Sequence, residues 1–364
     1  MPWPATWSAP IASVPALSSD VHDVLAAGGG EGAGEGLLEA ARRVAEEVLA
    51  PAAEVTDRAP VVPASHLEAL AAGGLMGLYR PPAAPPAVVR EVYEALAGAC
   101  GVTFFVWVQH HAPVRMLAAS ANEGLRDRYL DDLCAGRVLG GVAFAYLRRP
   151  GPPAVVATPV AGGYRIDGEA PWVTSWGLAG VFAVAARLDD QVLFFVLEPG
   201  HDHTHPSPPL ALAAMGASST VRLTFDDLFV PEDDVLSVVA FDRWRADDRL
   251  ATAKPNPAAF GIAATCVRLL GDTPLAAELD DCRRRSYAMA DAAEPHVDAL
   301  VEARAHSLEL AVRAATALVV ATGGRAMSVG HPAQRLLREA AFFTIQAQTP
   351  ALRQATLDQL APRS

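Results

Sequence analysis

The chain has 364 residues, 51% of them hydrophobic and 19% charged, and a formal net charge of −12 at pH 7. This length is sufficient for one large core or for two to three smaller ones. The acidic balance, with no run that interleaves basic and aromatic residues, argues against a nucleic-acid-binding protein. An acidic surface mainly favours solubility.

Cysteine usage and the N-terminal sequence predict the cellular setting. The four cysteines are scattered, form no C-x-x-C pair and lie in apolar or helical stretches. They indicate reduced thiols rather than disulfides or a zinc site. Residues 1–20 contain neither a basic start nor a long apolar run, so we expect no signal peptide and no membrane-spanning segment. Together these features predict a cytoplasmic protein.

Hydrophobic periodicity divides the chain into an N-terminal segment and three domains. Residues 1–36 are rich in Pro, Ala, Ser and Gly and predict a flexible segment. Residues 37–138 have apolar residues at three- and four-residue spacing, which predicts an N-terminal helical domain. Residues 139–239 are short β-rich runs separated by turns and predict an antiparallel β-domain. Residues 240–364 return to the helical period, so the fold class is α+β and mainly α.

One β-rich run carries three large or polar residues at alternate positions. The sequence GEAPWVTSWG places Trp172, Thr174 and Trp176 two residues apart. In a regular strand the three side chains would share one face. A strand edge packed on a helix explains this pattern, and so does a surface for a broad, flat ligand.

Several segments, in the right order along the chain, resemble the acyl-CoA dehydrogenase superfamily. In the N-terminal helices they are LAPAAEVTDRAPVVP and GGLMGLYRP. The β-region contributes GGYRIDGEAPWVTSWGLAGVFAVAAR and VRLTFDDLFVPEDDVL, and the C-terminal helices contribute VVATGGRAMSVGHPAQRLLREAAFFTIQ. Each segment alone is a weak signal, but together they cover most of the chain.

The resemblance implies a fold, a cofactor and partners. The fold is an N-terminal helical domain, a middle β-barrel-like domain and a C-terminal four-helix bundle. Its members bind FAD and assemble as homodimers or homotetramers. The implied function is that of a FAD-dependent oxidoreductase. Its substrate would be an acyl thioester, or an acyl group bound to CoA or another carrier, and its redox partner an electron acceptor or a flavin reductase.

The resemblance also implies the cofactor-binding residues. Trp172 would pack near the isoalloxazine ring, and Thr174 would hydrogen-bond near its N5/O4 edge. A broad apolar ring system needs such an aromatic neighbour and a few placed polar groups. Gly323 and Gly324 match a turn that approaches the adenine-side phosphates of a neighbouring subunit's FAD. Thr349 matches a threonine that contacts the nucleotide.

The chain departs from the superfamily at the catalytic base. The position of the usual glutamate falls on Ala347, and the alternative position on an earlier helix falls on Ala253. Neither side chain can accept a proton, and the loss of a general base costs roughly 10²–10⁴-fold in rate.

The flavin and nucleotide contacts also differ. A threonine that bonds the flavin falls on Ala145, so the backbone of Phe144 and Ala145 would make that contact. Arg148 and Arg149 stand where a serine helps to seat CoA, and they suit a phosphate. The Arg-x-x-Phe-Gly segment that grips a neighbour's FAD is absent from DTPLAAELDDCRRRSYAM.

These departures leave three functions open. Besides the acyl oxidoreductase, a flavin-dependent monooxygenase on the same fold needs no thioester base, and reduced flavin reacts there with O₂. His110 and His111 are its candidate catalytic residues, although a buried structural role explains them as well. A non-catalytic flavin-binding or partner subunit is the third candidate.

A histidine-rich loop raises the separate question of a metal. His201, His203 and His205 alternate in PGHDHTHP, a spacing that suits metal ligands. The Pro-Gly start of this stretch predicts a solvated loop instead, so we predict no metal site.

Overall fold

The computed structural model describes residues 31–361. The predicted flexible segment 1–36 therefore lies mostly outside the described residues. Its last part is helical, because the first helix begins at Glu31, before the predicted start at Leu37.

Helices make up the first third of the described chain. They are α2 (Glu31–Val44), η1 (Ala45–Leu49), α3 (Ala50–Thr56), α4 (Ala64–Ala72), α5 (Pro86–Ala99), α6 (Gly101–Ala119) and α7 (Glu123–Cys134). Helix α6 is apolar on nearly all sides, and Trp107 on it is fully buried. Such a helix belongs in the interior of a protein, and α6 indeed contacts α5, α7 and β1.

The middle region is one eight-stranded sheet. Its strands are β1 (Gly140–Ala143), β2 (Val155–Val160), β3 (Gly163–Val173), β4 (Val181–Leu188), β5 (Gln191–Leu197), β6 (Thr204–Pro206), β7 (Val221–Pro231) and β8 (Val235–Ala240). The strand order is β6-β7-β3-β2-β4-β5-β8, and β1 pairs with β4. Short helical turns, η2 (Ala145–Arg148), η3 (Gly216–Ser218) and η4 (Glu232–Asp234), interrupt it.

The sheet is mixed, so the prediction of a purely antiparallel domain is wrong in this respect. Strand β1 runs parallel to β4, with Gly140 opposite Val181, and β2 meets β4 in parallel at Val156 and Arg187. All other strand pairs are antiparallel. The parallel pairs join segments distant in sequence, which no local turn signal reveals.

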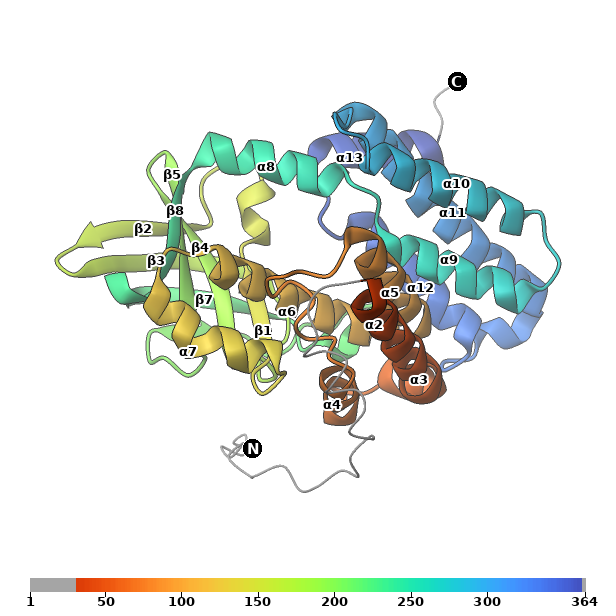
Figure 1. Cartoon of the computed structure of the whole chain (residues 1–364), viewed down its shortest axis with the longest axis horizontal. Helices are drawn as coiled ribbons and strands as arrows, with labels where there is room; N and C mark the ends of the chain where they lie inside the picture. The colour runs from red at the N-terminus through yellow and green to blue at the C-terminus, as the bar shows by residue number, and fades with distance from the viewer. Residues whose placement is uncertain (1–30, 362–364) are drawn as a thin grey trace.

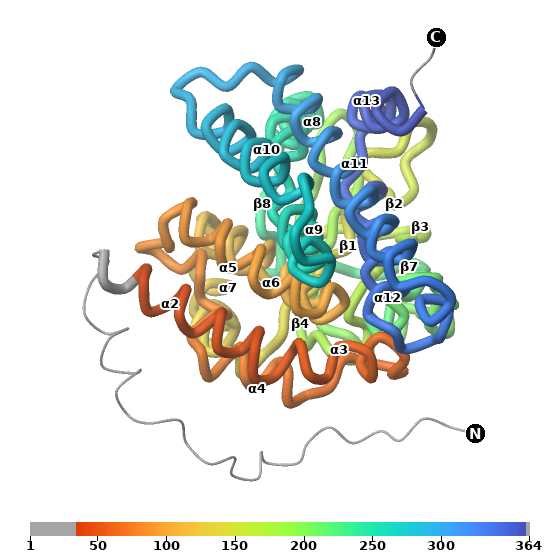
Figure 2. The backbone as a smooth tube through the Cα atoms, turned by 90° about the vertical axis from the view of Figure 1, so that its right-hand side faces the viewer, coloured from red at the N-terminus to blue at the C-terminus, as the bar shows by residue number. Residues whose placement is uncertain are grey.

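The C-terminal third is again helical. It contains α8 (Phe241–Ala253), α9 (Pro257–Leu270), α10 (Leu275–Ala290), α11 (Val297–Thr322), η5 (Gly323–Met327), α12 (Pro332–Ile345) and α13 (Pro350–Leu360). Figure 2 shows α11 between α9 and α12, and it contacts both helices as well as α10 and α13. By length and composition alone the helical stretch Val297–Met327 could cross a membrane, and within the described residues α11 packs against four other helices of the bundle.

The three regions lie side by side. The sheet is at one end, the bundle of α9 to α12 is at the other, and α5 and α6 lie between them (Figure 1). Helix α8 spans the top from the sheet to the bundle. Glycines allow α5 and α9 to touch: a Cβ on Gly98 would lie 2.6 Å from the Gly261 backbone oxygen. The N-terminal domain and the bundle therefore pack as one body around α5 and α6.

Candidate functional site

Trp172 lies at an irregularity in β3, and this changes which residues share its face. The pairing of β3 with β7 shifts register between Ala170 and Val173. Trp172 there has a positive φ of 63° and is 50% exposed, whereas Thr174 is only 4% exposed. The expectation of a common face for Trp172, Thr174 and Trp176 is therefore wrong, because a bulge breaks the two-residue alternation.

Thr174 begins a chain of three buried hydroxyl groups. Its Oγ1 lies 3.1 Å from Thr220 Oγ1, which lies 2.7 Å from Ser218 Oγ. Each hydroxyl donates one hydrogen bond and accepts others, so Thr174, which has Thr220 as its side-chain partner, can make a further hydrogen bond. The next aromatic residue, Trp176, turns away and stacks on Phe182 at 5.3 Å. Of the three residues at alternate positions, Trp172 is exposed to a ligand and Thr174 has spare hydrogen-bonding capacity.

The segment Phe144–Ala145 connects two elements that contact β3. Strand β1 and turn η2 both contact β3. Tyr146 anchors the turn because its hydroxyl donates to the backbone oxygen of Ala185 and lies 2.9 Å from that of Ala143. Phe144 packs edge-on against Phe194, and Ala145 is exposed. The structure therefore brings Phe144 and Ala145 to the neighbourhood of the strand that carries Trp172.

The two positions matched to the superfamily's base, Ala253 and Ala347, lie on either side of Arg304. The Arg304 guanidinium donates from Nη1 to the backbone oxygens of Thr252 and Lys254, both at 3.1 Å. It donates from Nη2 to the Gln346 oxygen at 3.4 Å. The residues next to both alanines are thus bound by one arginine of α11.

Arg148 and Arg149 differ from each other in their surroundings. Arg148 pairs side-on with Asp248 of α8, donating from Nε at 2.9 Å and from Nη2 at 2.7 Å. Both side chains of this pair are mostly buried. Arg149 is exposed. Only Arg149 is therefore free to meet a phosphate without breaking an ion pair.

His110 and His111 lie in the core. His110 Nε2 donates to the Met76 backbone oxygen at 3.2 Å, and its Nδ1 accepts from the Gly140 N–H at 2.9 Å. Burial lowers the pKa of His110 to about 4. Both nitrogens of His111 are buried without a hydrogen-bond partner. The His111 ring lies edge-on to Trp107 at 4.5 Å, and burial lowers its pKa well below the usual value. This geometry favours the structural interpretation of both residues.

The histidine-rich loop lies on the protein surface, with His201, His203 and His205 all exposed. The His203 ring bonds through Nδ1 to the Asp226 oxygen at 2.7 Å, while His201 lies 6.4 Å from it. Within residues 31–361 no group of three or more His, Cys, Asp or Glu side chains is arranged to hold a metal ion.

Gly323, Gly324 and Thr349 have clear local roles. Gly323 ends α11 with a φ of 69°, a conformation that favours glycine. A Cβ on Gly323 or Gly324 would meet nothing within 4 Å, so the turn is open to an approaching molecule. Thr349 caps α13, and its hydroxyl accepts from the Leu352 N–H at 3.3 Å. None of the three lies at Trp172, so the structure of one chain separates them from the first group of candidates.

Comparison with known proteins connects this architecture to a family. Residues 34–137 match the family model described as acyl-CoA dehydrogenase, N-terminal domain. The solved structure of butyryl-CoA dehydrogenase from Megasphaera elsdenii is similar with a TM-score of 0.76 and 19% identity, over 90% of this chain and 97% of that one. The likeness over the remaining residues is one of fold, so only the N-terminal domain carries a family match in this chain. The α–β–α order of the chain is the superfamily fold, as the sequence predicted.

Two further relatives show the range of the superfamily. Benzylmalonyl-CoA dehydrogenase from Aromatoleum aromaticum is 25% identical over 206 residues, which are 54% of this chain and 55% of that protein. The chain thus spans about half the length of this relative. Dibenzothiophene monooxygenase from Paenibacillus sp. A11-2 has the same fold, with a TM-score of 0.72 and 16% identity over 89% of this chain and 96% of that one. The superfamily fold therefore hosts both dehydrogenases and a monooxygenase.

Members of the superfamily bind FAD, and the residues at β3 fit a flavin. A half-exposed indole at Trp172, a hydroxyl chain ending at Thr174 and the exposed residue Ala145 come from elements that contact one another. They offer one flat apolar contact and a few polar ones, as a flavin ring requires. Trp172 and Thr174 would contact the ring from different sides of the bulge rather than from one face of a strand.

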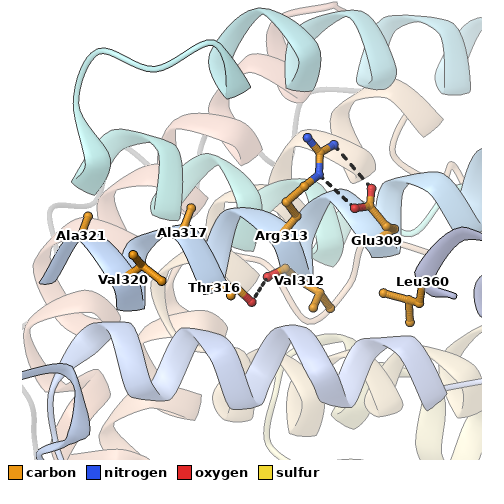
Figure 3. A pocket seen from close by; sticks show the side chains of 8 residues that line it. All are labelled: Glu309, Val312, Arg313, Thr316, Ala317, Val320, Ala321 and Leu360. Atoms are coloured by element: carbon orange, nitrogen blue, oxygen red, sulfur yellow. Dashed lines mark hydrogen bonds and ion pairs between the residues drawn. The ribbon is translucent and has the colours of Figure 1, made fainter. Parts of the chain in front are cut away.

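A groove lies on the helical bundle, and none of these residues lines it. It has a volume of about 540 Å³ and is lined by α11 and the end of α13, as Figure 3 shows. Arg313 and Glu309 form an ion pair at its rim, at 2.9 Å. Val320 and Leu360 expose apolar surface in it. The superfamily's cofactor residues do not line this groove, so it is a surface feature of the bundle.

Arg304 is the site residue that sequence reasoning missed. It stands in an ordinary helical pattern, VEARAHSLEL, and nothing there distinguishes it from a solvated arginine. Its backbone partners Thr252, Lys254 and Gln346 lie 52, 50 and 42 positions away in the chain. Only the folded structure brings them together.

Proposed function

We propose that this chain is a FAD-dependent oxidoreductase that acts on an acyl thioester or a carrier-bound acyl group. The observation that carries the proposal is the half-exposed indole of Trp172, followed two residues later by the hydroxyl of Thr174, on a strand that contacts turn η2 in an acyl-CoA dehydrogenase fold. When bound, FAD supplies a two-electron acceptor. The redox partner is an electron acceptor or a flavin reductase, and the protein is cytoplasmic.

The residues of this chain would bind and orient the flavin. The exposed indole of Trp172 covers apolar ring surface. Thr174 directs its free hydroxyl position to a polar edge of the ring, because Thr220 already bonds its other side. The backbone of Phe144 and Ala145 supplies the contact for which other members use a threonine side chain. Gly323 and Gly324 serve a neighbouring subunit's nucleotide, and Thr349 lies next to it.

Assembly is part of the proposal. Three apolar side chains near the end of α11 are strongly exposed: Val320 at 75%, Met327 at 61% and Val329 at 74%. Monomeric proteins seldom expose such clusters. A homodimer or homotetramer would cover them and bring the open Gly323-Gly324 turn to a second subunit.

The alanines at both base positions favour a second candidate, a flavin-dependent monooxygenase. Abstraction of a substrate proton needs an acceptor within hydrogen-bond reach, and Ala253 and Ala347 supply none. A monooxygenase needs no such acceptor, but His110 and His111, its candidates from the sequence, are buried in the core with lowered pKa values, so another group would have to supply its proton. The similar fold of dibenzothiophene monooxygenase supports this alternative. A non-catalytic flavin-binding subunit is the third candidate.

Restoring a carboxylate distinguishes these functions. The purified protein is first examined for the visible absorption of an oxidised flavin. Acyl-CoA oxidation with an artificial electron acceptor is then measured for the wild type, Ala347→Glu and the matched neutral variant Ala347→Gln. For the acyl oxidoreductase we expect Ala347→Glu alone to raise turnover, by at least tenfold.

The other outcomes identify the alternatives. Product hydroxylation with a flavin reductase and O₂, without thioester oxidation in any variant, would establish the monooxygenase. Flavin binding without either reaction would establish the non-catalytic subunit. A protein that neither purifies with flavin nor binds added FAD would refute both enzymes and the flavin-binding subunit, and would leave only a partner subunit without flavin.

A further inference from the structure

Arg304 is a buried cation without a carboxylate partner. Arg304 is 6% exposed and is one of the buried residues of α11. Twenty ion pairs join the residues of the described chain 31–361, and none of them includes Arg304. Buried charges are ordinarily paired, because removal from water is costly. The charge of Arg304 therefore needs an explanation.

The hydrogen bonds of Arg304 leave one edge of the guanidinium free. Nη1 uses its donors on the oxygens of Thr252 and Lys254, at 3.1 Å each. Nη2 makes one long bond of 3.4 Å to Gln346, and Nε is buried without any partner. The free edge is thus the one formed by Nε and Nη2.

The Nε–Nη2 edge of Arg148 shows which group such an edge is suited to bind. Arg148 donates from Nε and Nη2 to the two oxygens of Asp248, in a side-on pair. Planar bidentate pairs of this kind are the strongest hydrogen-bonded contacts of arginine with carboxylates. Arg304 presents the equivalent edge with no carboxylate in place.

The local charges are unbalanced in the direction that attracts an anion. Burial, together with the smaller effect of the nearby Arg148 charge, lowers the pKa of Arg304 to about 10. Asp248 pairs with Arg148, so no carboxylate is left to balance the charge of Arg304. The carbonyl end of α8 compensates only part of this excess, since a helix end carries about half an elementary charge.

We propose that the Nε–Nη2 edge of Arg304 binds the carboxylate group of a ligand, between the two alanines that occupy the superfamily's base positions. The bond to Gln346 is the weakest that Arg304 makes, and the neighbouring Ala347 is in the left-handed region with a φ of 53°. A carboxylate that displaces Gln346 from Nη2 gains two charge-assisted hydrogen bonds. The carboxylate belongs either to a free small acid or to the acyl chain of a thioester.

A small carboxylate tests the site without any requirement for CoA or flavin binding. Thermal unfolding of the full chain is followed in sodium formate and, at equal ionic strength, in sodium chloride. We expect formate to raise the Tm of the wild type and to have no effect on Arg304→Gln. The matched control is Arg249→Gln, which loses an exposed arginine of α8 paired with Asp298 and keeps the response to formate.

A second variant keeps the test decisive if Arg304→Gln fails to fold. Ala347→Glu places a carboxylate beside Arg304, and we expect it to raise the Tm in chloride and to remove the response to formate. The proposal is overturned if formate stabilises the wild type and either variant, Arg304→Gln or Ala347→Glu, equally. It is also overturned if formate does not stabilise the wild type.

The affinities of succinyl-CoA and butyryl-CoA distinguish the two sources of the carboxylate, and this arm rests on the proposed function. At least tenfold tighter binding of succinyl-CoA, lost in Arg304→Gln, would assign the site to the acyl chain. Equal affinities with an intact formate response would assign it to a free acid. If neither thioester binds while formate does, the acyl function fails and the carboxylate site stands.

Discussion

The Glu339 carboxylate accepts a hydrogen bond from the Gly101 N–H at 3.1 Å, so an acid of α12 lies on the N-terminal end of α6. The positive end of the α6 dipole stabilises a negative charge there. Arg335, one turn earlier on α12, donates to Glu339 at 2.8 Å and to Glu54 of α3 at 3.0 Å. A Cβ on Gly101 would lie 2.6 Å from Glu339 Cδ, so only glycine permits this contact.

We predict that Glu339→Ala destabilises the fold strongly. The residue is 1% exposed, and its loss leaves part of the buried Arg335 charge and the Gly101 N–H without a partner. Removal of one partner from a buried pair costs about 3–5 kcal/mol. Urea unfolding measures the loss. The control Glu123→Ala removes an exposed pair with Arg126 and should cost less than about 1 kcal/mol. Equal losses in the two variants would contradict this role of Glu339.

Hydrophobic periodicity was enough to predict the order of the elements, because helix and strand periods are local properties of the chain. It did not predict the parallel pairs of β1 and β2 with β4. Nor did it predict the bulge at Trp172, since no local signal marks a tryptophan with a positive φ. Register and bulges depend on the partner strand, which a single sequence does not show.

The candidate site was predictable only as far as the superfamily motifs reach. They pointed to Trp172 and Thr174 at the end of one strand, and the structure shows that turn η2, which contains Ala145, contacts that strand. They could not reveal Arg304, because its role depends on hydrogen bonds to backbone oxygens some 40 to 50 residues away in the chain. A buried charge is recognised from its surroundings rather than from its own sequence pattern.

Trp172→Ala should lose flavin while keeping the fold. The side chain is 50% exposed, so its truncation removes little core packing, but it removes aromatic stacking worth on the order of 1 kcal/mol beyond area burial. Bound flavin is measured by absorbance after purification, and stability by thermal unfolding. Trp107→Ala is the opposite case, because loss of this fully buried indole should lower the free energy of unfolding by about 3–5 kcal/mol. Unchanged FAD affinity in Trp172→Ala would refute the placement of the flavin.

Assembly through the end of α11 is testable with a single charge. Val320 is 75% exposed in the groove of Figure 3, and Val320→Glu would place a charge in the proposed contact between subunits. We expect sedimentation velocity at micromolar concentration to show an oligomer for the wild type and a monomer for Val320→Glu. The control Val55→Glu changes an equally apolar residue on α3, 66% exposed, and should remain oligomeric. A monomeric wild type, with or without FAD, would contradict the proposed assembly.

Three buried histidines predict that the fold weakens in mild acid. Burial lowers the pKa of His66, His110 and His111, and that of His110 reaches about 4. Unfolded histidine has a pKa near 6.5, so between pH 6.5 and 4 the unfolded state binds more protons than the folded state. Stability therefore rises with pH across this window and falls as the solution is acidified. For His110 alone the loss amounts to about 3 kcal/mol by pH 4.

His111→Leu isolates one of these histidines without breaking a hydrogen bond, because neither of its ring nitrogens has a partner. At pH 7.5 we expect a change in the free energy of unfolding of less than about 1.5 kcal/mol, since the volumes are similar. At pH 5 the variant should be more stable than the wild type, because the unfolded state no longer gains a proton at this position. Urea unfolding at several pH values measures both effects, with the exposed His205→Leu as control. A pH dependence as steep as that of the wild type would show that His111 does not stay neutral in the folded core.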